Sequence, residues 1–200
     1  MAQPHQAQET KALLRKRQRE LSSSVSEAQL AEASLAVVVR LRQHETYRRS
    51  QRILFFAAIR GEPRLEELMV DALAAGKIVA LPRFDSTNGC YAAALVQSPS
   101  GLERARFGIL EPSPAAALLP LNQLDLALVP GVAFDVGGGR LGRGKGFYDL
   151  LLVSVTAVKC GVALDHQLEP NIPREPHDLI MDCIVTPSRW IDVSRGAGWK

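Results

Sequence analysis

The sequence is poor in cysteine: Cys90, Cys160 and Cys183 are the three cysteines among its 200 residues. Their odd number, their wide spacing and the lack of any C-x-x-C pair argue against a disulfide framework and against a zinc site. Cys160 and Cys183 lie in strand-like apolar runs, so we expect both in the core. A reducing, cytoplasmic environment fits this cysteine usage best.

Long apolar runs are also missing. No stretch of eighteen apolar residues occurs, and the N-terminal segment MAQPHQAQETKALLRKRQREL has no apolar region of the kind that a signal peptide requires. We therefore expect a soluble protein with no membrane partner.

Neither sign of charge is in large excess, since the formal net charge is +3. This mildly basic balance favours an anionic ligand without demanding nucleic acid. A basic cluster could still follow a nucleic-acid backbone, and such a binding module is our alternative from another functional class. Its residues are Arg42, Arg48, Arg49 and Arg52. The absence of an aromatic and basic repeat weighs against this alternative, so we expect no nucleic-acid partner.

What the sequence does contain predicts one layered α/β domain. Its apolar content of 46% is enough for a sizeable core, so we expect a single domain over residues 1–200, monomeric by default. Apolar runs predict strands at residues 52–59, 77–84, 90–96, 124–134, 159–164 and 182–187. Helical patterns occupy residues 9–21, 63–76 and 147–158. Another helix is expected up to about residue 47, and it opens on a capping box of Ser24 and Glu27. This alternation predicts a three-layer α/β/α domain with a largely parallel central sheet.

The stretch GRLGRGKG, residues 139–146, carries the strongest chemical signal. It is spaced like a phosphate-binding P-loop, but Gly146 stands where that motif has a Ser or Thr for the metal. The loop follows the predicted strand 124–134, and ligands bind open α/β sheets at the carboxyl ends of strands. Its glycines let backbone N–H groups approach an anion, and its cations supply charge, so we predict a polyphosphate site rather than a flexible basic hairpin. The residues concerned are Arg140, Gly142, Arg143, Gly144, Lys145 and Gly146.

Three further polar residues could complete this site. Asp149 lies three residues beyond Gly146, close enough for its carboxylate to hold Mg²⁺ beside bound phosphates in place of the missing hydroxyl. Lys11 and Arg15 are four residues apart, so on a helix they share one face. That face could grip one anion, or it could be an ordinary solvated basic surface.

The stretch LVPGVAFDVGGGRLGRGKGFYD, residues 128–149, resembles the signature of the 5-formyltetrahydrofolate cyclo-ligase family, also called methenyltetrahydrofolate synthetases. The resemblance extends over most of the chain. It includes KALLRK at residues 11–16, GEP at 61–63, FGILEP at 107–112, GVALDHQL at 161–168 and EPHDLIMDCIVTP at 175–187. One departure is Leu65, where the family often has Thr.

This resemblance implies an ATP- and magnesium-dependent ligase. Such an enzyme converts 5-formyltetrahydrofolate to 5,10-methenyltetrahydrofolate with release of ADP and phosphate, through phosphorylation of the formyl oxygen. Because little covalent chemistry falls to the protein, positioning and charge neutralisation should dominate catalysis. A catalytically idle homologue that binds another pterin or nucleotide is the nearer alternative.

The resemblance also implies roles for individual residues. Lys11 and Arg15 match an ATP-contacting pair, and residues 140–146 match the phosphate loop, with Arg143 and Lys145 as its catalytic cations. Asp149 matches a magnesium carboxylate, with Asp178 as a second candidate. Glu62, Phe107 and Tyr148 match substrate-binding positions, and a carboxylate such as Glu62 suits the amino and ring N–H donors of a pterin.

Overall fold

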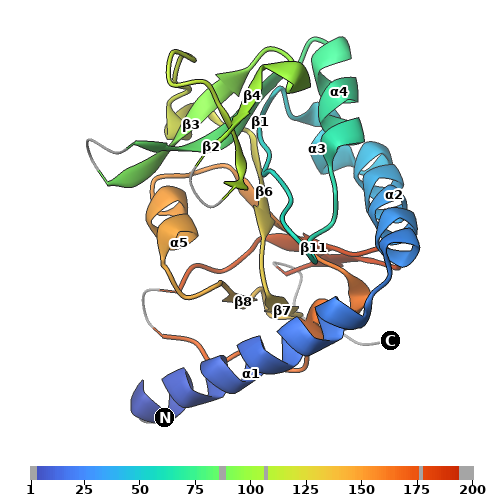
Figure 1. Ribbon diagram of the computed structural model, residues 1–200, viewed down its shortest axis with the longest axis vertical. Helices are drawn as coiled ribbons and strands as arrows, with labels where there is room; N and C mark the ends of the chain where they lie inside the picture. Colours follow the sequence, from blue (N-terminus) through green and yellow to red (C-terminus); the bar gives the residue numbers. More distant parts are fainter. Residues whose placement is uncertain (1–3, 86–88, 106–107, 176–177, 194–200) are drawn as a thin grey trace.

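The computed structural model describes residues 4–85, 89–105, 108–175 and 178–193 (Figure 1). The helices are α1 (Pro4–Ser24), α2 (Glu27–Gln43), α3 (Glu45–Arg49), α4 (Glu66–Ala74) and α5 (Phe147–Leu152). The first six strands are β1 (Arg52–Leu54), β2 (Ile78–Asp85), β3 (Cys90–Val96), β4 (Leu102–Arg104), β5 (Leu110–Pro112) and β6 (Leu126–Pro130). The others are β7 (Ala133–Asp135), β8 (Arg140–Leu141), β9 (Val158–Val162), β10 (Leu168–Glu169), β11 (Cys183–Val185) and β12 (Trp190–Asp192).

A seven-stranded sheet with the order β12-β11-β9-β6-β1-β2-β3 forms the centre of the molecule. The strands β11, β9, β6, β1 and β2 are mutually parallel, and the edge strands β12 and β3 pair antiparallel to their neighbours. The predicted α/β class with a largely parallel sheet is therefore confirmed. From β1 the chain adds β2 on one side of that strand, and it later adds β6, β9 and β11 on the other side. The sheet therefore has a topological switch point between β1 and β6.

Both faces of this sheet are covered. Successive strand residues point to opposite faces, so Ile53 belongs to the core beneath α2, α3 and α4, whereas Leu54 belongs to the core on the α5 side. The second outer layer is thin, because besides α5 it consists largely of segments without regular structure, such as the one that contributes Leu119 and Leu124. Cys160 and Cys183 are both buried, as predicted, and are register partners on β9 and β11.

Helix α1 lies apart from these two layers. Figure 1 shows it running beneath β7 and β8 at one end of the molecule. There Leu14 packs against a small apolar cluster that contains Val132 and Leu141. In this way α1 approaches the segment that follows β6. Among the helices that the structure describes, none has the length and apolar character needed to cross a bilayer.

Several predicted boundaries were wrong. The capping box uses Ser26 and Gln29 rather than Ser24 and Glu27, because α1 continues to Ser24. The predicted strand 124–134 divides after Pro130, and β7 joins a second sheet with the order β10-β7-β8. At this division the Phe134 ring lies close against Gly131, where an added Cβ would be 2.7 Å from it.

Candidate functional site

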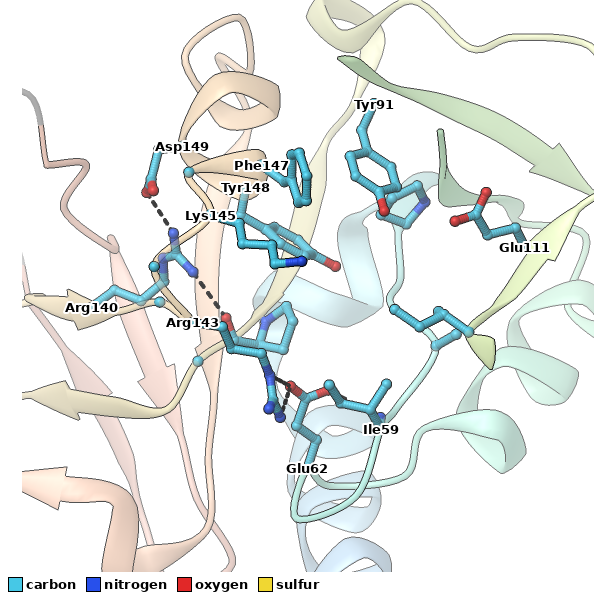
Figure 2. A pocket seen from close by; sticks show the side chains of 18 of the residues that line it. Ile59, Glu62, Tyr91, Glu111, Arg140, Arg143, Lys145, Phe147, Tyr148 and Asp149 are labelled. Carbon is cyan, nitrogen blue, oxygen red and sulfur yellow. Dashed lines mark hydrogen bonds and ion pairs between the residues drawn. The ribbon is translucent and has the colours of Figure 1, made fainter. Parts of the chain in front are cut away.

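A cavity of about 250 Å³ opens at the carboxyl ends of β1 and β6, at the switch point of the sheet (Figure 2). Ligands of open α/β sheets bind at this position. The segment after β1 contributes Ala57, Ile59 and Glu62. The end of β6 and the segment after it contribute Pro130, Gly131, Arg140 and residues 142–149. The strands β2, β3 and β5 complete the wall with Pro82, Tyr91, Leu110 and Glu111, together with Ile109. The predicted phosphate loop therefore lies on a cavity wall.

The buried carboxylate of Asp135 holds the base of this loop. Its Oδ1 accepts hydrogen bonds from the backbone N–H groups of Gly137 and Gly139, each at 2.9 Å, and from the Arg174 guanidinium at 2.8 Å. A Cβ at Gly139 would lie 2.4 Å from Asp135 Oδ2, so this close approach requires glycine. The run of three glycines thus forms the β7–β8 hairpin, whereas residues 142–146, here called the phosphate loop, line the cavity together with Arg140.

Within the phosphate loop, Gly144 and Gly146 have positive φ values of 92° and 67°, which glycine adopts without strain. Gly146 is the N-cap of α5, so the helix begins at Phe147 as predicted. Arg143 and Lys145 are exposed, and Figure 2 shows the Lys145 amine directed into the cavity near Tyr148. The loop therefore brings glycine backbone and two cations to the same cavity wall.

Glu62 and Arg143 form an ion pair across the cavity. Arg143 Nη2 donates to Glu62 Oε1 at 3.1 Å, and the other carboxylate oxygen accepts from the Ile59 N–H at 3.2 Å. The Glu62 side chain is 7% exposed, whereas that of Arg143 is 48% exposed. Burial raises the pKa of Glu62 above its ordinary value, and the nearby charge of Arg143 opposes this rise without cancelling it. A predicted substrate carboxylate and a predicted ATP cation are thus in direct contact.

Asp149 and Arg140 form a second pair on the cavity wall. Arg140 Nη2 donates to Asp149 Oδ1 at 2.5 Å, and Arg140 Nη1 donates to the Pro130 carbonyl at 3.3 Å (Figure 2). The Arg140 side chain is only 4% exposed and lies over the Tyr148 ring. Arg140 therefore ties β8 to the end of β6 and to α5, while Asp149 keeps a partly exposed carboxylate beside the phosphate loop.

Aromatic side chains form another part of the wall. Tyr148 lines the cavity, as the sequence predicted for a substrate-binding residue, and burial raises its pKa. Phe147 and Tyr91 line it as well and meet edge to face with ring centroids 5.3 Å apart. Sequence analysis missed both, although Phe147 adjoins the phosphate loop. Phe107 lies outside the described residues.

The predicted pair Lys11 and Arg15 is divided between two environments. Arg15 Nε donates to the Gly142 carbonyl at 2.8 Å, so this guanidinium lies against the phosphate loop. Lys11 is buried and pairs with Asp178 at 2.6 Å and with Glu175 at 2.9 Å. Burial by itself lowers the pKa of Lys11, but its bonds to these two carboxylates outweigh that effect and raise it. Asp178 therefore docks α1, apart from the described residues that line the cavity.

Two structurally important positions escaped the sequence analysis in different ways. Glu111 lines the cavity. The FGILEP motif contains this residue and was therefore a signal for it, but the sequence predicted no role for Glu111. Leu65, the noted departure from the family pattern, is 2% exposed and packs in the core beneath α4. The departure therefore affects core packing.

Comparisons with known proteins identify relatives of this chain. The sequence profile of the 5-formyltetrahydrofolate cyclo-ligase family matches residues 7–187. The 5-formyltetrahydrofolate cyclo-ligase of mouse is 32% identical over 161 residues, which cover 74% of this chain and 79% of the mouse protein. That of Mycolicibacterium smegmatis is 44% identical over 98 residues, which cover 46% of this chain and 50% of that protein.

A solved structure gives the same result for the fold. The 5,10-methenyltetrahydrofolate synthetase of Aquifex aeolicus has a TM-score of 0.85 and 32% sequence identity, with 95% of this chain and 96% of that chain covered. Sequence profile, relatives and fold thus point to one family over nearly the whole chain. The chain belongs to the 5-formyltetrahydrofolate cyclo-ligase family.

Proposed function

We propose that this protein is an ATP-dependent ligase that converts 5-formyltetrahydrofolate to 5,10-methenyltetrahydrofolate and releases ADP and phosphate. The observation that carries the proposal is one cavity in which a basic glycine loop, a buried carboxylate and aromatic side chains meet. The loop suits the phosphates of ATP, and the carboxylate and aromatic rings suit a flat ring system that carries N–H donors. Family membership gives the reaction that joins these two substrates.

The reaction needs charge neutralisation more than covalent help. The formyl oxygen attacks the γ-phosphorus and ADP leaves, after which N10 adds to the activated formyl carbon and phosphate is expelled. Arg143 and Lys145 face the negative charge of the transferred phosphoryl group, and the backbone N–H groups of residues 142–146 add fixed dipoles. Because Arg143 also contacts Glu62, one guanidinium lies at the junction of the phosphate site and the folate site.

Magnesium fits this site as a companion of ATP. Mg²⁺ is usually held by one or two carboxylates together with substrate phosphates and water. Asp149 offers one partly exposed carboxylate beside the loop, and within the described ranges no cluster of three or more His, Cys, Asp or Glu side chains is placed to hold a metal. In this proposal Asp149 contributes one ligand to Mg²⁺ that neutralises phosphate charge. Asp178 is the weaker candidate because it binds Lys11 on α1 and is not among the described residues that line the cavity.

The alternative functions receive less support. A nucleic-acid-binding module would use the cluster on α2, α3 and β1, but Arg42 pairs with Glu67 and Asp71, and Arg49 pairs with Glu45. The sequence feature that favoured a catalytically idle homologue is the departure at Leu65. This side chain packs in the core, so the departure does not change the cavity wall.

The proposal is tested by the growth of methenyl product absorbance when the protein is mixed with 5-formyltetrahydrofolate, ATP and Mg²⁺. We expect turnover that depends on all three, with one ADP formed for each methenyl product. Binding of ATP and folate without turnover would support the idle homologue. Tight, salt-dependent binding of an oligonucleotide that ATP does not displace would support the nucleic-acid alternative.

A further inference from the structure

Glu111 is a buried carboxyl group whose hydrogen bonding is half complete. The residue is 4% exposed, and its Oε2 accepts the backbone N–H of Phe84 at 2.9 Å. Its Oε1 is fully covered and has no hydrogen-bond partner in the part of the chain that the structure describes. A buried acceptor without a donor is unfavourable, so its retention calls for an explanation.

The position of Glu111 supplies a candidate explanation. It is the central residue of β5, and β5 forms part of the cavity wall. Figure 2 shows its carboxyl group directed toward Tyr91, on the side of the cavity across from Arg140 and the phosphate loop. Because the Phe84 N–H fixes one oxygen, the orientation of the other is set by the backbone of β2.

The surroundings of Oε1 define the ligand that would satisfy it. The walls nearby are aromatic and apolar, with Tyr91, Phe147, Pro82 and Leu110 among the lining residues. A matching ligand is therefore flat and carries an N–H donor on its rim. A pterin has this form, since its 2-amino group and the adjacent ring N–H project from one edge of the ring.

Glu62 is less suited to that edge. Its two oxygens are already engaged, one by Arg143 and the other by the Ile59 N–H, and it lies beside the phosphate loop. A folate whose formyl group reaches the loop therefore places its reacting part near Glu62 and Arg143. The far edge of its pterin then extends toward the aromatic part of the cavity.

We propose that Glu111 is a substrate-binding residue that accepts a hydrogen bond from the 2-amino edge of the pterin. This inference rests on the proposed function and deepens it, because it assigns the end of the cavity opposite the phosphate loop. Glu111 thereby selects folates over flat ligands that lack a donor at this edge.

The test uses Glu111→Gln, with Glu103→Gln as the matched control. Glu103 is exposed on β4 and is the register partner of Glu111 in the same two-stranded sheet. In Glu111→Gln, either the Phe84 N–H or the pterin must face the amide NH₂, so two donors oppose each other. We expect the KM for 5-formyltetrahydrofolate to rise about 10- to 100-fold, with kcat and the KM for ATP nearly unchanged. Glu103→Gln should match the wild type in all three constants.

A second measurement varies the substrate, and its wild-type arm does not depend on folding of the variant. A 2-desamino analogue of 5-formyltetrahydrofolate should have a KM raised by a similar factor, and Glu111→Gln should discriminate little between the analogue and the normal substrate. An unchanged KM in Glu111→Gln, or full discrimination by that variant, overturns this inference while leaving the proposed function intact. Absence of wild-type turnover with 5-formyltetrahydrofolate and ATP contradicts the proposed function itself.

Discussion

Arg143 donates to the buried carboxylate of Glu62 over 3.1 Å, although 81 residues separate the two along the chain. A cation that we assign to ATP and a carboxylate that we assign to folate therefore contact each other. This contact makes it possible to ask, by substitution, whether the two residues serve different substrates.

Glu62→Gln should weaken folate binding by about tenfold or more, because a neutral amide replaces a carboxylate acceptor and presents a donor beside the reacting part of the folate. ATP binding should change little, since Arg143 can still donate to the amide oxygen. Calorimetric titration with each substrate separately measures both effects. An equal loss of affinity for ATP and folate would contradict this division of roles.

The difference in folding stability between the wild type and Glu62→Gln should depend on pH. The pKa of Glu62 is raised above its ordinary value of 4.5 by burial, so above that value the unfolded chain releases a proton that the folded protein retains. The Glu62 contribution to stability is therefore greatest below pH 4.5 and declines as pH rises through the folded-state pKa. The free energy of unfolding of the wild type minus that of Glu62→Gln should be smaller at about pH 8 than at about pH 4. Urea unfolding at both values checks this, and a difference that grows with pH would show that Arg143 dominates.

Arg143→Ala and Lys145→Ala should each raise the KM for ATP and lower kcat. Both cations face charge that develops during phosphoryl transfer, and losing one such contact costs on the order of 2–4 kcal/mol in transition-state stabilisation. Lys16→Ala is a suitable control because Lys16 is an exposed cation on α1 and its removal changes the net charge equally. Steady-state kinetics with varied ATP measures the effect. Wild-type constants in both loop variants would refute the assignment of this loop.

Asp149→Asn should weaken the dependence on magnesium and reduce activity together, because a neutral amide oxygen is a poorer ligand for a hard divalent cation. The amide oxygen can still accept the hydrogen bond from Arg140, so the loss of folding stability should be no more than about 1 kcal/mol. Activity against magnesium concentration, combined with thermal unfolding, separates these effects. If the magnesium curve is unchanged and only stability falls, Asp149 serves to hold Arg140 in place.

Local patterns in the sequence were sufficient for the class of the fold and for the place of the glycine-rich loop before α5. The runs at β6 and β11 are apolar and buried throughout, as is typical of strands covered on both faces, and such strands form parallel sheets. The glycine and cation spacing of residues 139–146 is likewise a local signal, and the backbone conformation that it predicts is set by those glycines themselves.

Only the tertiary structure decided which charged groups meet. Lys11 and Arg15 look equivalent on one helical face, yet Lys11 is buried against Glu175 and Asp178 while Arg15 reaches the loop. The pair Glu62 and Arg143 and the half-satisfied carboxyl of Glu111 were equally hidden in the sequence. Each depends on segments far apart in the chain that packing brings together, and the desolvation that distinguishes a buried charge from an exposed one exists only after that packing.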